Sequence, residues 1–302
     1  MNGLLIIDKP AGLTSHDVVA RVRRILKTKR VGHTGTLDPF ATGVMVILVG
    51  QATRLAQFLD KDEKEYEALV QFGFETDTGD LTGVRIADCG LRNEELSELL
   101  NKAAWEEIPT QFRGEITQIP PMYSAKKVGG KKLYEFARKG VEIERKPLNV
   151  IISKLEILRK SEIRNPQSAI RIRVACSAGT YIRTLAEDIG RAVGVGAHLA
   201  ELRRTRAGRF DIAGALTLAG LEEMADPVSA LIPMSEAVVH LPEVVLNEER
   251  VAKTKNGLSS RFLDAGLADG NSVRMVNTDS ALIAIGVYDA EEKTVQPKVV
   301  LG

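Results

Sequence analysis

One carboxylate draws attention because it lies in the middle of a glycine-rich loop. Asp38 falls within residues 32–43, which carry Gly32, Gly35 and Gly43, and it directly precedes Pro39. Glycines let the backbone bend where a Cβ would clash and give a ligand close access, and the proline keeps Asp38 out of helical dihedrals. Taken alone, an Asp-Pro pair favours a turn aspartate that bonds its own backbone. A phosphate-binding loop is excluded, since no Gly-Lys-Ser/Thr follows.

A second segment places an aromatic residue and a cation where an expected strand runs into an expected helix. Tyr181 and Arg183 follow the small-residue turn at residues 177–180. Arginine is suited to holding a carboxylate through paired hydrogen bonds. From this segment alone, a structural arginine with a surface partner is as good an interpretation.

Lysines form the third signal, at residues 119–132. Lys126 and Lys127 follow Tyr123, and a Gly-Gly turn separates them from two further lysines. Interleaved basic and aromatic residues suit an arm that contacts nucleic acid, although a basic run is more often a solvated face.

Composition limits the class of protein. The chain has 302 residues, 44% hydrophobic and 27% charged, which is typical of a globular protein and excludes wholesale disorder, collagen and a disulfide scaffold. Two distant cysteines and four scattered histidines give no zinc spacing. The N-terminus lacks a signal-peptide pattern and no apolar stretch is long enough to span a bilayer, so we expect a cytoplasmic protein without membrane or metal.

The net charge of +1 conceals a strong asymmetry along the chain. Residues 1–35 hold seven Lys or Arg against two Asp, whereas residues 222–249 hold seven acidic residues and no Lys or Arg. Local basic patches permit a specific polyanionic partner, while the near-neutral total argues against indiscriminate binding.

The expected elements indicate an α+β protein. Strands are predicted at residues 4–7, 44–49, 66–72, 149–158 and 170–176, and helices after Thr14, at 94–104 and at 181–193. They lack a regular βαβ period, so we predict a mixed, largely antiparallel sheet with flanking helices. After an acidic, proline-spaced stretch, three strand-like runs predict a small, mostly β domain. The predicted domains are residues 1–235 and 240–302. Glu75, Asp77 and Asp80 are assigned to a hairpin turn rather than a metal site.

Several motifs together resemble one family, the bacterial tRNA pseudouridine-55 synthases, which are the B-type branch of the pseudouridine synthases. The matching runs stand in the family's order and cover residues 3 to about 218: LLIIDKPAGLT (4–14), GHTGTLDPFATG (32–43), KEY (64–66), PPMYSAKK (120–127), GTYIR (179–183), GAHL (196–199) and LRR (202–204). Ala178 departs from the pattern, which has a basic residue there in many members. The C-terminal part resembles a PUA-type RNA-binding domain.

The resemblance implies the pseudouridine synthase fold and roles for individual residues. It implies Asp38 as the nucleophile, Arg183 as its ion-pair partner, and Tyr181 beside them. Tyr66 would pack on the target base and Leu202 would form an apolar wall. The remaining implied substrate contacts are Lys9, His33, Lys126 and Lys127.

The implied reaction isomerises a T-loop uridine of tRNA after the base is flipped out of its stack. It oxidises nothing, so no cofactor is expected, and the implied partner is the T-arm of tRNA without an obligate protein partner. Basic segments at residues 21–30, 126–132 and 203–209 are the expected RNA contacts.

Three alternatives are weighed against this interpretation. A catalytically silent RNA-binding protein is disfavoured by the presence of Asp38, Tyr66 and Arg183. A guide-RNA-dependent relative is disfavoured by the short segment before residue 4. A retaining glycosidase needs a second carboxylate about 5 Å away, and none is evident in the sequence.

Overall fold

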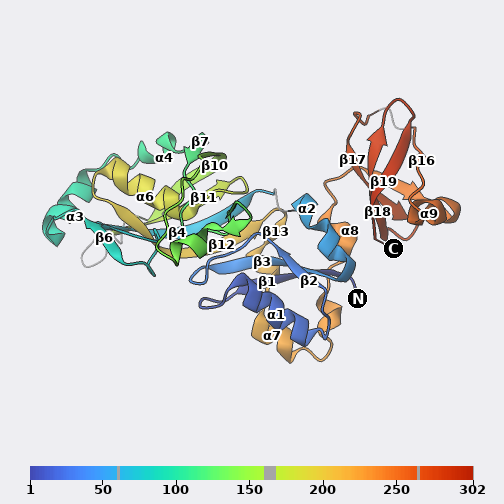
Figure 1. The fold of residues 1–302 in the computed structure, drawn as a ribbon, viewed down its shortest axis with the longest axis horizontal. Coiled ribbons are helices and arrows are strands. Elements are labelled where there is room, and N and C mark those ends of the chain that lie inside the picture. The colour runs from blue at the N-terminus through green and yellow to red at the C-terminus, as the bar shows by residue number, and fades with distance from the viewer. Residues whose placement is uncertain (60–61, 160–167, 264–265, 302) are drawn as a thin grey trace.

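Two separate sheets organise the chain. The computed structural model describes residues 1–302 except 60–61, 160–167, 264–265 and 302. Within this described part, ten strands form a large mixed sheet and five strands near the C-terminus form a second sheet. Figure 1 shows the second sheet in red and orange, standing to one side of the first. The predicted α+β class is confirmed, with a largely antiparallel main sheet and a mostly β C-terminal part.

The large sheet runs in the order β14-β1-β3-β12-β4-β11-β10-β7, with β2 paired to β3 and β13 paired to β12. Only the β1–β14 and β3–β12 pairings within it are parallel among the described strands. Its strands are β1 (Gly3–Lys9), β2 (Val31–Thr34), β3 (Thr42–Val49), β4 (Lys64–Phe72), β7 (Gly114–Gln118), β10 (Leu148–Arg159), β11 (Ala169–Cys176), β12 (Ala197–Ala207), β13 (Phe210–Asp211) and β14 (Leu216–Thr217).

Helices flank this sheet, and the first one begins where the sequence predicts. Thr14 accepts a hydrogen bond from the backbone of Asp17, whose side chain accepts from the Thr14 backbone, so a capping box starts the helix. None of the described helices is long and apolar enough to cross a bilayer. The helices of this part are α1 (Ser15–Ile25), α2 (Ala56–Leu59), α3 (Asn93–Lys102), α4 (Ile108–Gln111), α5 (Leu133–Ala137), α6 (Ile182–Val193) and α7 (Leu218–Glu223).

Two short hairpins project from the large sheet. One is formed by β5 (Phe74–Thr76) and β6 (Arg85–Asp88), and the other by β8 (Lys127–Val128) and β9 (Lys131–Lys132). Gly129 and Gly130 join β8 to β9 and both have positive φ, which is the backbone that a two-residue hairpin loop needs. The lysine-rich segment is therefore a tight hairpin.

The second sheet has the order β15-β17-β18-β19-β16. It shares a hydrophobic cluster with one face of the large sheet: Leu4 and Ile6 of β1 belong to the same cluster as Val276, Leu282 and Leu301. The boundary predicted between residues 235 and 240 stays a prediction. This part contains α8 (Met234–Ala237), β15 (Glu243–Leu246), α9 (Glu248–Lys255), β16 (Ser260–Arg261), β17 (Ser272–Asn277), β18 (Leu282–Asp289) and β19 (Thr294–Val300).

A close approach between strands makes one glycine necessary. Gly43 pairs with Arg204 across the parallel β3–β12 junction, and its φ is +103°. A Cβ built there would lie 2.2 Å from the backbone oxygen of Arg204 and 2.7 Å from its nitrogen. Backbone atoms cannot move aside as a flexible side chain can, so this position admits glycine only.

We expect Gly43→Ala to lower the free energy of unfolding by about 4 kcal/mol, because a positive-φ penalty and an interstrand clash add. Gly12→Ala is the matched control: its φ is +85°, but a Cβ there meets nothing within 4 Å. It should cost about 1–2 kcal/mol from backbone strain alone. Urea denaturation of both variants measures the difference, and equal losses would contradict the clash.

Candidate functional site

The loop that carries Asp38 is anchored on both sides of that residue. The Ser15 hydroxyl accepts from the Leu37 amide at 2.9 Å and donates to the Leu37 carbonyl at 3.1 Å. On the other side, the Lys9 amine donates to the carbonyls of Pro39 and Ala41 at 3.1 and 2.6 Å. These hydrogen bonds fix the position of Asp38, although it lies in neither a helix nor a strand.

Lys9 lies beneath the Asp38 loop. The residue is fully buried, and its amine donates to three backbone carbonyls, the third being Pro10 at 2.9 Å. Burial lowers the pKa of Lys9 to about 8, with Asp38 opposing that change. Lys9 therefore supports the Asp38 loop from within the protein, and its expected contact with substrate stays a prediction.

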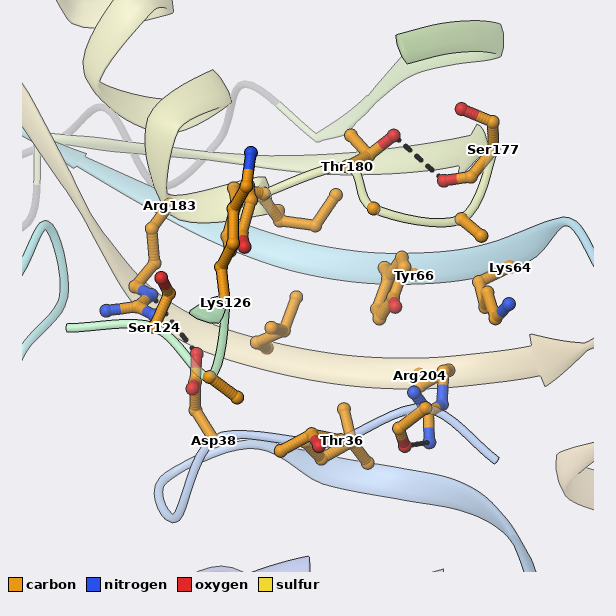
Figure 2. Close-up of a pocket in the computed structure, with 18 residues that line it drawn as sticks. Thr36, Asp38, Lys64, Tyr66, Ser124, Lys126, Ser177, Thr180, Arg183 and Arg204 are labelled. Atoms are coloured by element: carbon orange, nitrogen blue, oxygen red, sulfur yellow. Dashed lines mark hydrogen bonds and ion pairs between the residues drawn. The ribbon is translucent and has the colours of Figure 1, made fainter. Parts of the chain in front are cut away.

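Arg183 lies in the first turn of α6 and binds Asp38. Its Nε is 3.1 Å from Asp38 Oδ2, and Figure 2 shows the two side chains pointing toward one another. Its Nη2 donates to the Tyr123 carbonyl at 2.7 Å and its Nη1 to the Thr78 carbonyl at 2.9 Å. The side chain is only 6% exposed. A guanidinium bound on three sides can hold Asp38 in one orientation.

A second carboxylate completes this arrangement, and the sequence analysis missed it. Asp80 Oδ2 lies 3.5 Å from Arg183 Nη1, and its Oδ1 accepts from the backbone amide and hydroxyl of Thr82 and from the hydroxyl of Thr78. Asp80 is 4% exposed. From sequence alone, an aspartate that binds a buried arginine is hard to distinguish from a turn aspartate that only bonds its own backbone. Both occur in turns beside glycine and threonine.

A cavity of about 250 Å³ lies beside the Asp38–Arg183 pair (Figure 2). Segments far apart in sequence meet there: the Asp38 loop, β4, the turn before α6, β12 and the start of the lysine hairpin. The predicted residues that line it are Asp38, Tyr66, Lys126, Tyr181, Arg183 and Leu202, and Ser124, Ala178 and Arg204 line it as well.

Burial dominates the electrostatics of Asp38. A third of its side-chain surface faces the open cavity, but protein surrounds the rest. Burial raises the pKa of Asp38 above its ordinary value, Arg183 and Lys9 lower it, and Asp80 raises it. Arg183 acts in the expected direction, but it does not bring the pKa below the usual range. The carboxylate is therefore poorly solvated, paired and open to the cavity.

Two tyrosines face the same cavity. Tyr66 is 9% exposed, and burial raises the pKa of its hydroxyl while Arg204 lowers it. Burial likewise raises the pKa of Tyr181, partly offset by the Ser124 hydroxyl. The backbone of Tyr181 exchanges two hydrogen bonds with the Gln118 side chain, at 2.9 and 3.2 Å. Both rings are held by the strands and turn around them.

The other predicted contacts lie outside the cavity lining. His33 is on β2, with its ring centroid 6.0 Å from that of His16 in an edge-to-face arrangement. Burial lowers the pKa of His33, and so does the neighbouring His16. Lys127 is exposed on β8, next to Lys126 at the cavity.

The arginines at residues 203–209 also have partners within the protein, and their expected role as RNA contacts stays a prediction. Arg203 pairs with Asp8 at 2.8 Å and Arg206 with Glu63 at 2.6 Å. Arg209 pairs with Glu236 at 2.7 Å. Arg204 is 1% exposed and donates to backbone carbonyls. Each of these four arginines therefore has an acceptor within the protein.

Across the part of the chain that the structure describes, no group of three or more His, Cys, Asp or Glu side chains is placed to hold a metal ion.

Comparisons with known proteins agree with this geometry. A family model described as the N-terminal domain of TruB family pseudouridylate synthases matches residues 23–182. A model described as the C-terminal domain of tRNA pseudouridylate synthase B matches residues 183–239. The chain is 43% identical over 302 residues to "tRNA pseudouridine synthase B" of Heliobacterium modesticaldum, covering 99% of this chain and 95% of that protein. It is 47% identical over 236 residues to the protein of that name from Bordetella parapertussis, covering 78% and 93%.

Solved structures match as well. A Cbf5-Nop10-Gar1 complex contains a chain that is similar with a TM-score of 0.71 at 30% identity, covering 99% of this chain and 85% of that one. An H/ACA RNP bound to a substrate RNA containing 2′-deoxyuridine gives a TM-score of 0.70 at 27% identity, with the same coverage.

Because the pKa of Asp38 is raised in the folded protein, its ionised carboxylate lowers the free energy of unfolding. An acid whose folded pKa is raised stabilises the fold at low pH and loses that contribution as pH rises through the folded value. Asp38→Asn should therefore increase the free energy of unfolding at pH 8, because it removes a charge that burial disfavours while Arg183 keeps Asp80 as a partner. The gain should shrink toward zero as pH falls to the ordinary value of 3.8.

Urea denaturation at several pH values measures this difference. The control is Glu144→Gln, which removes an exposed carboxylate and should change little at any pH. A destabilised Asp38→Asn at pH 8 would mean that the ion pair outweighs the burial cost.

Proposed function

Because the chain belongs to the TruB family of pseudouridylate synthases, we propose that it converts uridine 55 in the T loop of tRNA to pseudouridine. The observation that carries the proposal is the Asp38–Arg183 pair at a cavity that Tyr66 and Leu202 also line. The reaction breaks the N1–C1′ bond, turns the base and joins C5 to C1′. It is an isomerisation, so it requires no oxidant, energy source or cofactor.

Asp38 is the proposed nucleophile. A carboxylate can form a covalent adduct with the substrate and thereby divide one difficult step into two easier ones. Burial makes this carboxylate poorly solvated, which favours attack, and Arg183 supplies a positive charge that favours its ionised form. Asp80 fixes the far end of the guanidinium, so that Nε remains directed at Asp38.

The cavity walls suit a uracil base. Tyr66 and Tyr181 offer aromatic faces on which a base can stack, and Leu202 provides an apolar wall. The base must leave its stack to reach Asp38, and the folded T loop presents bases that are splayed rather than paired. Tyr66 is also the group proposed to assist removal of the C5 proton.

The T-arm is the proposed partner, bound without an obligate protein partner. The β8–β9 hairpin carries three lysines, and Lys126, directly before it, lines the cavity. Phosphates of the arm that surrounds the target loop would lie near this hairpin. Its charge should therefore contribute a salt-dependent share of the affinity.

Asp38→Asn tests the chemistry. The variant keeps the size of the side chain but loses the negative charge, so tRNA binding should be near normal while turnover falls below detection. Tritium release from tRNA labelled at C5 of uridine measures turnover, and filter binding measures affinity. Glu144→Gln is again the control. Substantial turnover in Asp38→Asn, checked by mass spectrometry for deamidation to aspartate, would refute Asp38 as the nucleophile.

The salt dependence of binding tests the hairpin. Changing Lys126, Lys127, Lys131 and Lys132 to Gln should weaken tRNA binding and reduce the slope of log K against log salt. Each lost phosphate contact should remove roughly 0.7–0.9 of a slope unit. The control changes Lys102 and Lys253, which pair with glutamates on helix surfaces at 2.7 Å. An unchanged slope in the hairpin variant would place the hairpin away from the RNA.

A further inference from the structure

A buried cation in the cavity wall is not used by the mechanism above. Arg204 is 1% exposed although it lines the cavity. Its Nε donates to the Val44 carbonyl at 2.6 Å and its Nη2 to the Gly35 carbonyl at 3.2 Å. Both acceptors are backbone carbonyls rather than carboxylates. The guanidinium is therefore fixed in place while its charge acts on its surroundings.

Strand register puts this cation beside Tyr66. Arg204 of β12 is directly opposite Tyr66 of β4, and directly opposed residues project their side chains on the same face. On its other side, Arg204 is opposite Gly43 of β3, which has no side chain. In Figure 2 the Tyr66 ring lies next to the Arg204 guanidinium, between it and the turn before α6.

A guanidinium can only donate, so the Tyr66 phenolic oxygen is the acceptor of any hydrogen bond between these two side chains. Arg204 opposes the effect of burial on Tyr66, whereas Asp38 and Cys176 add to it. The other charged or titratable groups at the same cavity are Lys64, Lys126, Tyr181 and Arg183.

We infer that Arg204 is a positioning residue for Tyr66: its guanidinium holds the phenolic oxygen so that it faces the flipped base and stabilises negative charge on it during proton transfer. This inference rests on the proposed function. The Tyr66 hydroxyl releases its proton to water, and once C5 has joined C1′ the resulting phenolate takes the C5 proton. N1 takes one proton from water, so the isomerisation is balanced.

The test uses the full chain with Arg204→Gln, which removes the charge, and Arg204→Lys, which keeps it. Single-turnover rates on a T-arm RNA are measured across pH, and binding is measured separately. Arg204→Gln should lower the rate at neutral pH at least 100-fold with Kd changed less than twofold, and Arg204→Lys should recover part of the loss. Arg171→Gln is the control: it removes a sheet arginine that pairs with Glu201 and does not line the cavity.

Two readouts separate positioning from a general loss of structure. In a Tyr66→Phe background, adding Arg204→Gln should leave the residual rate unchanged, since the group that Arg204 serves is already absent. With ¹³C-labelled tyrosines, of which the chain has five, the Tyr66 signal should titrate at least one pH unit higher in Arg204→Gln. The signal is assigned by its loss in Tyr66→Phe.

Equal rate losses in the Tyr66 and Tyr66→Phe backgrounds, or an unmoved Tyr66 titration, would overturn the inference. If Arg204→Gln does not fold, the same two readouts on Arg204→Lys decide it, because a displaced cation must still shift the Tyr66 titration. Absence of pseudouridine with the unaltered protein would overturn the proposed function instead, while the titration would still report on the effect of Arg204 on Tyr66.

Discussion

The buried charge of Arg183 is the constraint around which the site is built. A guanidinium removed from water must find acceptors for its donors, and leaving it unpaired would cost several kcal/mol. Its acceptors come from separate segments: Asp38 from the glycine loop, Asp80 and Thr78 from the turn after β5, and Tyr123 from the segment before the lysine hairpin. Satisfying one side chain thus brings together the segments that form the cavity wall.

Sequence reasoning succeeded where local chemistry determines the structure. The Thr14 capping box, the strands at 44–49 and 170–176 and the helix that begins at Ile182 follow from residue type and periodicity over short windows. The family motifs then placed Asp38, Tyr66, Tyr181 and Leu202 together, and they do line one cavity. Distant motifs can be joined in this way because each lies in a strand of the large sheet or in a segment next to one.

Sequence reasoning failed where the position of a side chain depends on the face of the strand that it occupies. Residues 197–207 are rich in Ala, Leu, Glu and Arg, which favour helix, yet they form the central strand β12, interrupted by two register shifts. Had this strand been predicted, alternation would have put Leu202 and Arg204 on one face and Arg203 on the other. The burial of Lys9 was also not predicted, because whether a strand residue is buried depends on tertiary packing.

How cations are paired decides where this nearly neutral protein is positive. Arg203, Arg206 and Arg209 are matched by carboxylates, so their charges largely cancel at the surface. Lys9 and Arg204 are instead bound by carbonyls. Lys9 lowers the pKa of Asp38, and Arg204 lowers the pKa of Tyr66. Interactions across a low-dielectric interior are screened less than those at the surface. The choice of partner therefore limits nonspecific attraction for polyanions at the paired arginines and directs the charge of the two carbonyl-bound side chains at Asp38 and Tyr66, to which the proposed chemistry assigns roles.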